Sequence, residues 1–181
     1  MVDGVELDIS VSDDRWAPLI NDAEAFCRPI IAAALAAAER VDAGPRGNVE
    51  VSVVLSNDAE VAALNSKFRD KAGPTNVLSF PLWSEDGGPI VPDAPVVLGD
   101  IVFAYDTIVA EAVAQEKTPD NHLRHLLVHG VLHLVGFDHI EENEAELMEA
   151  METQILQGLG VLDPYAALPE SNGLLGSTAH G

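Results

Sequence analysis

The chain has 181 residues, of which 48% are apolar, and its 9 basic and 30 acidic residues give a formal net charge of −21. This length suits one domain, which we expect over residues 1–162, followed by a flexible tail over 163–181 that is rich in Pro, Gly, Ser and Ala. The charge opposes non-specific binding to nucleic acid. The single cysteine, Cys27, excludes disulfides within the chain and zinc ribbons built from cysteines.

The sequence predicts neither export nor a membrane span. Acids stand at the N-terminus where a secretory signal would carry positive charge. The longest apolar run, at 29–38, has about ten residues, half of the roughly twenty that cross a bilayer. We therefore expect a cytoplasmic protein.

The first part of the chain predicts two strands separated by helix. Apolar and polar residues alternate at 5–10 and at 49–55, which is typical of strands with one buried face. Between them, an Ala-rich apolar pattern from about 17 to 40 predicts helix. Pro29 lies inside this pattern and marks a kink or a boundary between two shorter helices.

A further helix is predicted to end near residue 68. Its N-cap is one of three adjacent residues with short polar side chains: Ser56, Asn57 or Asp58. Residues 77–80 and 96–104 predict the third and fourth strands. The Pro/Gly/Asp-rich segment between them, at 81–95, is expected to be an exposed loop.

The remainder of the chain is helical in pattern, at roughly 106–116, 120–135 and 141–157. Three glycines are the expected terminators: Gly136, Gly158 and Gly160. Strands early and helices late predict an α+β fold. We expect a small mixed four-stranded sheet packed against about five helices, with a buried central helix that carries metal ligands.

The run at 129–139, His-Gly-Val-Leu-His-Leu-Val-Gly-Phe-Asp-His, predicts a metal site. On a helix, His129 and His133 leave the same face one turn apart, with about 5–6 Å between their Cβ atoms. The rest of this helix is apolar nearly all round, so imidazoles buried there need a hydrogen bond or a metal. Gly136 can end the helix and let the chain fold back, which brings His139 towards the first two histidines.

Three neutral imidazoles leave a fourth position open, which is the coordination of a catalytic zinc whose water has a pKa near about 7. We expect one Zn²⁺ per chain. Asp138 can orient the second nitrogen of a ligand. His125 lies on the same stripe and forms an equally good helical pair with His129; the position of His139, close to the helix end, favours His133 instead.

The same spacing occurs in the metzincin proteases, whose pattern is His-Glu-x-x-His-x-x-Gly-x-x-His. Their glutamate acts as general base towards the metal-bound water. Gly130 stands at that position here and has no side chain to accept a proton. The substitution argues against peptide hydrolysis by that route.

Residues 129–139 resemble the signature His-Gly-x-Leu-His-Leu-x-Gly-aromatic-Asp-His of the YbeY family of bacterial endoribonucleases. Residues 64–71, followed by 74–81, resemble the second motif of that family, and Leu-Gly-Asp-Ile at 98–101 resembles the third. The resemblance covers roughly residues 50–157 in order and spacing.

The resemblance implies a metal-dependent, single-strand-directed endoribonuclease that acts in ribosomal RNA maturation, especially at the 3′ end of the small-subunit RNA, and in ribosome quality control. It implies the ligands His129, His133 and His139. It also implies a catalytic Arg69, whose guanidinium can meet two phosphate oxygens in a forked contact. The implied partners are ribosomal RNA and the small ribosomal subunit with its proteins, and no DNA is expected.

Several assignments stay open. Lys67 and Lys71, which form a local cationic group with the arginine between them, either hold the RNA backbone or form a solvated helix end, whereas glutamates crowd 141–152. No general base is assigned; His125 and Asp100 are candidates. One alternative function is a non-catalytic ribosome assembly factor with a structural zinc, and another is a metallohydrolase of a peptide or small ester.

Overall fold

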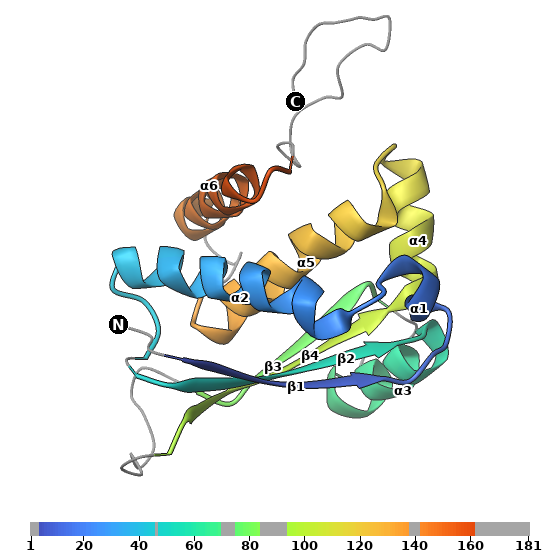
Figure 1. Ribbon diagram of the computed structural model, residues 1–181, viewed down its shortest axis with the longest axis horizontal. Coiled ribbons are helices and arrows are strands. Elements are labelled where there is room, and N and C mark those ends of the chain that lie inside the picture. The colour runs from blue at the N-terminus through green and yellow to red at the C-terminus, as the bar shows by residue number, and fades with distance from the viewer. Residues whose placement is uncertain (1–3, 46, 70–74, 84–93, 138–141, 162–181) are drawn as a thin grey trace, which may run out of the picture.

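The computed structural model describes five parts of the chain: 4–45, 47–69, 75–83, 94–137 and 142–161. The predicted tail lies outside them. Within these parts a four-stranded sheet is packed against helices, so the α+β class is confirmed (Figure 1). None of the described helices is long and apolar enough to cross a membrane.

The sheet is mixed and has the strand order β1-β2-β4-β3. The strands are β1 Val5–Val11, β2 Val49–Ser56, β3 Val77–Pro81 and β4 Val96–Ala104. Strands β1, β2 and β4 are parallel, and β3 pairs antiparallel with β4 at one edge. Alternate residues of β2 are fully buried, because every second side chain of a strand points to the same face.

Six helices are described, the first of them a single turn. They are α1 Trp16–Leu19, α2 Ala23–Arg40, α3 Asp58–Arg69, α4 Tyr105–Ala114, α5 Pro119–Leu134 and α6 Glu142–Gly158. Of the two alternatives predicted at Pro29, the helix boundary is wrong, since α2 runs through this residue and the break before α2 falls at 20–22. Pro29 lies on the exposed side of α2, where water can hydrate the carbonyl that the proline leaves unpaired.

Capping side chains fix where two of the helices begin. Asn57 Oδ1 accepts a hydrogen bond from the Glu60 backbone N–H at 2.9 Å, which selects Asn57 among the three predicted caps of α3. Thr118 Oγ1 accepts from the Asn121 N–H at 3.3 Å, and Pro119 occupies the first position of α5. Both helices therefore start close to where the sequence predicts them.

Helix α5 is the central helix of the fold. It packs against α2, α4 and α6 on its sides and against β3 and β4 below (Figure 1). Helices α2 and α5 cover one face of the sheet, α6 packs against both of them, and α3 lies on the opposite face. The two histidines predicted as ligands thus stand on an element that is enclosed from several directions.

Two glycines of the sequence motifs permit close packing around α5 and β4. A Cβ atom at Gly130 would lie 3.0 Å from Ile101 Cγ2 and 3.4 Å from Ser79 Oγ. A Cβ atom at Gly99, where φ is +142°, would lie 2.2 Å from the Phe80 carbonyl oxygen. The position that carries a glutamate in metzincins therefore faces strand β4 here, where an added side chain would have to displace Ile101.

Candidate metal centre and pocket

Helix α5 brings two histidine rings together at a common point. The Nε2 atoms of His129 and His133 are 3.1 Å apart, and the ring centroids are separated by 4.5 Å. Two imidazole nitrogens bound to one tetrahedral zinc, at about 2.0–2.1 Å each, would lie about 3.3–3.4 Å apart. The pair therefore fits two positions of such a site after a small adjustment.

A buried carboxylate of α6 stands behind the first ring. Glu152 is 0% exposed, and its Oε2 lies 2.7 Å from His129 Nδ1. An ionised carboxylate can only accept a hydrogen bond, so it holds the proton of His129 on Nδ1 and leaves the lone pair on Nε2. This is the form of imidazole that binds a metal, and its lone pair is directed towards His133.

The contacts of Glu152 also decide between the two histidine pairs that the sequence offers as metal ligands. Its second oxygen, Oε1, lies 3.0 Å from His125 Nε2. The outer ring nitrogen of His125 is therefore directed to α6, whereas those of His129 and His133 are directed to each other. The geometry favours His129 with His133 over His125 with His129.

Of the two candidate general bases, His125 contacts Glu152 and Asp100 lies on the far side of the sheet from the histidines. Ile101, its neighbour on β4, is packed next to Gly130 of α5. Adjacent side chains of a strand leave opposite faces, so the Asp100 side chain points away from α5. Strand β4 thus shields Asp100 from the histidine pair.

A pocket of about 280 Å³ opens in front of the two rings. Its walls are β3 and the end of α5, and its lining residues are Val77, Leu78, Ser79, Pro81, His129 and His133. The second sequence motif therefore supplies the wall that faces the histidines. The motifs at 74–81 and 129–139 are distant in sequence and meet here.

The remaining predicted site residues are placed only in part. Arg69 is the last residue of α3, and its side chain lies outside the described part, as do Lys71, Asp138 and His139. Lys67 is an exposed residue of α3, on the sheet face opposite to α5. Within the described ranges, no three metal-ligating side chains are arranged so that together they could hold a metal ion.

Glu152 is a site residue that sequence reasoning misses. It belongs to the glutamate-rich segment, which we group by its charge alone. Helical spacing gives the missing signal, because Met148 and Ile155, one turn before and after Glu152, are both buried. A carboxylate at a core position of an amphipathic helix needs a hydrogen-bond donor or a positive charge beside it, which predicts a buried partner.

Comparison with known proteins identifies the family. A family model described as endoribonuclease YbeY matches residues 12–160. A relative from Bradyrhizobium sp. strain BTAi1, named endoribonuclease YbeY, is 54% identical over 159 residues, which cover 88% of this chain and 91% of the relative. The relative of the same name from Azorhizobium caulinodans is 49% identical over 162 residues, covering 90% and 97%.

A further relative agrees with these matches, and a solved structure has a similar fold. Endoribonuclease YbeY of Paramagnetospirillum magneticum is 46% identical over 161 residues, which cover 89% of this chain and 96% of the relative. A solution structure of a protein from Thermotoga maritima has a similar fold, with a TM-score of 0.51 and 23% identity, and covers 85% of this chain and 91% of that one. The chain belongs to the endoribonuclease YbeY family.

Proposed function

We propose that this family member cleaves single-stranded RNA with the help of one zinc ion held by His129, His133 and His139. The observation that carries the proposal is the 3.1 Å approach of two Nε2 atoms, one of them on a ring that Glu152 orients. His139 enters from its place in the sequence motif. Gly136, with φ of +108°, supports a reversal of the chain after α5.

We assign separate roles at this site to a buried carboxylate and to three basic residues. When bound, a zinc ion supplies Lewis-acid chemistry to water or to a phosphate oxygen. Glu152 keeps the His129 proton on Nδ1 and so holds that ring ready as a ligand. We assign to Arg69 the stabilisation of negative charge on the non-bridging phosphate oxygens, and to Lys71 contact with the RNA backbone. Lys67 lies on the sheet face opposite to α5, so we assign it contact only with RNA that extends beyond the histidine pocket.

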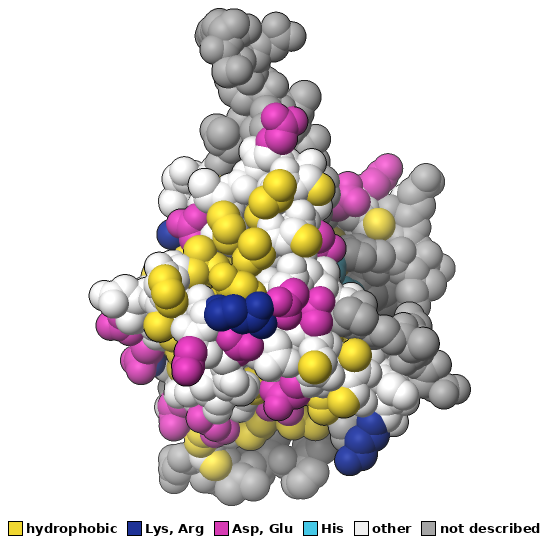
Figure 2. Space-filling model, turned by 90° about the vertical axis from the view of Figure 1, so that its right-hand side faces the viewer, with side chains coloured by type: hydrophobic (Ala, Val, Ile, Leu, Met, Phe, Trp, Pro, Cys, Tyr) yellow, Lys and Arg dark blue, Asp and Glu magenta, His cyan; other side chains and the backbone are white. Residues whose placement is uncertain are grey.

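The proposed substrate is ribosomal RNA, in particular the 3′ end of the small-subunit RNA, with a role in ribosome quality control in the cytoplasm. This part of the proposal rests on the family motifs. The strongly acidic surface, on which Lys and Arg are sparse in the face shown in Figure 2, suits contact with basic proteins of the small subunit. It opposes non-specific binding to DNA and RNA alike, so the proposal that DNA is not a substrate rests on the family motifs.

Metal content and RNA cleavage, measured on the same purified fraction, test the catalytic proposal. His133→Ala should lose zinc, and its cleavage of a labelled single-stranded RNA should fall by at least about 100-fold, because loss of a ligand exceeds the effect of losing a residue behind one. The matched control is His122→Asn on the same helix, whose ring contacts Glu111 instead. It should keep one zinc and near-normal cleavage.

Chelation gives the complementary test on the unmodified chain. Removal of zinc should abolish cleavage, and added zinc should restore it. Full cleavage after complete removal of the metal, or by His133→Ala, would overturn the proposal.

The cellular role is tested in bacteria that lack their own family member. The chain should restore trimming of small-subunit RNA precursors that are extended at the 3′ end, and Arg69→Ala should not. An Arg69→Ala variant that has lost RNA cleavage in vitro but still restores trimming would instead support the non-catalytic assembly role.

A further inference from the structure

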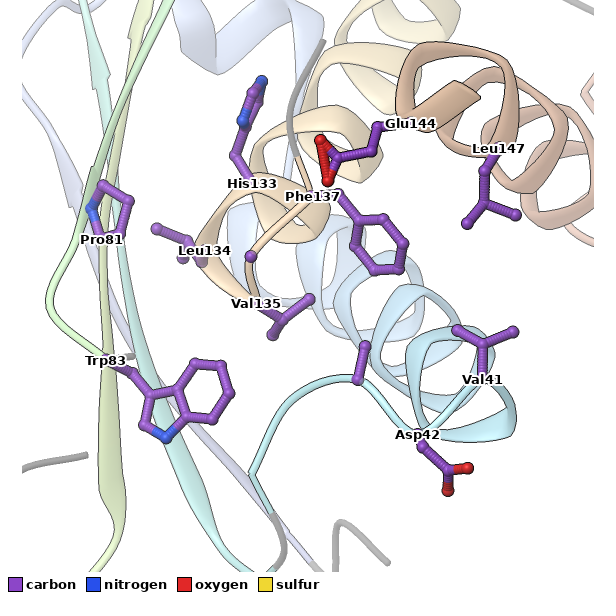
Figure 3. A pocket seen from close by; sticks show the side chains of 12 residues that line it. Val41, Asp42, Pro81, Trp83, His133, Leu134, Val135, Phe137, Glu144 and Leu147 are labelled. Atoms are coloured by element: carbon purple, nitrogen blue, oxygen red, sulfur yellow. The ribbon is translucent and has the colours of Figure 1, made fainter. Parts of the chain in front are cut away.

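A second cavity adjoins the histidine pocket. Its volume is about 660 Å³, and it shares Pro81 and His133 with the smaller pocket. It extends from Trp83, just beyond β3, past the turn that follows α5, to the beginning of α6 at Leu147 (Figure 3). We call this cavity the aromatic groove, defined by Pro81, Trp83, His133, Val135, Phe137 and Leu147.

Two aromatic side chains give the groove its character. Trp83 and Phe137 are half-buried and pack against the hydrophobic core, so each ring is held in place while part of it stays exposed. Figure 3 shows the indole of Trp83 on the strand side and the ring of Phe137 on the helix side, with Val135 between them. Rings presented in this way offer flat apolar surfaces to a planar ligand.

The charges around the groove select against phosphate. The described lining residues include no lysine or arginine, and the charged ones are Asp42 and Glu144. Carboxylates repel a phosphate group, but they do not repel an uncharged planar ring. Proteins that bind single-stranded RNA stack its bases on aromatic side chains, and stacking accepts any base because every base has a π-face.

We propose that the aromatic groove binds a nucleobase of the RNA, from a nucleotide that flanks the phosphodiester placed at His129 and His133. The inference rests on the proposed function, which puts a phosphodiester in the histidine pocket. Because His133 and Pro81 border both cavities, a nucleotide that leaves the pocket on this side enters the groove directly. Stacking also explains how a chain with a net charge of −21 holds RNA.

Tryptophan fluorescence reports on the groove without any cleavage. The chain has two tryptophans; Trp16 is 1% exposed, and Trp83 lines the groove. A short single-stranded oligoribonucleotide should therefore quench the fluorescence of Trp83. An abasic ribose-phosphate oligomer of the same length, or inorganic phosphate, should not. Equal quenching by the abasic oligomer would overturn the proposal.

Substitution of Trp83 measures the contribution of stacking. Trp83→Ala should raise the Kd and KM for single-stranded RNA about 5- to 100-fold with little change in kcat, whereas Trp83→Phe should keep most of the affinity. The matched control is Leu82→Ala, since Leu82 is 66% exposed and does not line the groove. Because stacking releases no counterions, the loss in Trp83→Ala should be the same at low and high salt.

The experiments distinguish an error in the groove proposal from an error in the proposed zinc-dependent cleavage. If Trp83→Ala cleaves RNA with an unchanged KM, the groove proposal is wrong and the zinc proposal stands. If the chain shows base-dependent quenching but neither binds zinc nor cleaves RNA, the proposed function is wrong and the groove remains an RNA-binding surface. Self-association that Trp83→Ala abolishes, without any effect of RNA, would assign the groove to a second copy of the chain and overturn the inference.

Discussion

Helix α5 carries histidines towards both of its ends, and the two ends use them differently. Near the start, His122 is 3% exposed and its Nε2 lies 2.8 Å from Glu111 Oε1, which also accepts from Asn76 Nδ2 at 2.9 Å. Near the end, His129 and His133 direct their Nε2 atoms towards each other and line a pocket. We call the first end closed, because a carboxylate engages the tip of its histidine ring, and the second end open, because its ring tips face a pocket.

The difference lies in which ring nitrogen a carboxylate contacts. Glu111 meets His122 at Nε2, the nitrogen at the tip of the ring, so the tip is already engaged. Glu152 meets His129 at Nδ1, and the tip stays directed into the pocket. Of these two histidines, only His129 keeps the nitrogen at the tip of its ring available to a ligand in the pocket.

Among the substitutions that test this difference, removal of the carboxylate behind His129 should have the largest effect, and the quantity affected is the zinc affinity. Glu152→Leu should weaken zinc binding about 10- to 100-fold, measured by competition with a chelator, because the His129 ring loses the acceptor that fixes its proton. Glu152→Gln, which keeps an acceptor oxygen, should lose less. The control is Glu149→Gln, an exposed residue of the same helix. Unchanged zinc affinity in a folded Glu152→Leu variant would contradict this role.

A methyl group at Gly130 should destabilise the packing of the open end of α5 against β4. Gly130→Ala places a Cβ atom 3.0 Å from Ile101 Cγ2, which should lower the free energy of unfolding by about 1–3 kcal/mol in a denaturant titration. Gly158→Ala is the matched control, since no heavy atom lies within 4 Å of its added Cβ. If both variants are as stable as the wild type, close approach of α5 to β4 is not required.

The smallest effect is expected at the closed end. His122→Asn should lower the free energy of unfolding by about 0.5–1.5 kcal/mol at neutral pH, through loss of the hydrogen bond to Glu111. Burial, opposed by that hydrogen bond, lowers the pKa of His122 in the folded chain. The unfolded chain therefore takes up a proton more readily, so the stability of the folded chain has its full value above about pH 6.5 and decreases as the pH falls below it.

The lowered pKa of His122 predicts how the stability of the chain depends on pH. Below about pH 6.5 the stability of the wild type should fall more steeply than that of His122→Asn. Unfolding in urea at a series of pH values measures the difference between the two chains, in which the contributions of the other histidines cancel. Parallel curves would show that His122 does not titrate differently on folding.

Much of the fold follows from patterns that the sequence displays directly. Strands β2 and β4 agree with prediction to within one residue, because alternation in β2 and an apolar run in β4 reflect burial by helices. The boundary predicted at Pro29 fails because a proline on the exposed side of α2 leaves its unpaired carbonyl accessible to water. Local propensity is outweighed there by the burial of the opposite helix face.

The candidate site is predictable only where its residues share one helix. His129 and His133 follow from their spacing, since one turn of α5 fixes their separation. Glu152 and Trp83 reach the site from other elements, and the sequence carries no spacing rule that connects them to α5. Glu152 is a buried carboxylate next to buried methionines of α6, and Trp83 lies just beyond β3. Only the packed structure shows that both residues are close to the histidines of α5.

X-ray absorption spectroscopy at the zinc edge shows whether three imidazoles hold zinc in this chain, since it reports the atoms around the metal independently of RNA cleavage. The wild-type chain loaded with zinc should show nitrogen neighbours at about 2.0–2.1 Å with the outer-shell scattering of three imidazoles, and His133→Ala should lose that pattern. If the chain binds no zinc, or if its zinc keeps the same imidazole neighbours in His133→Ala, the proposed zinc site is wrong.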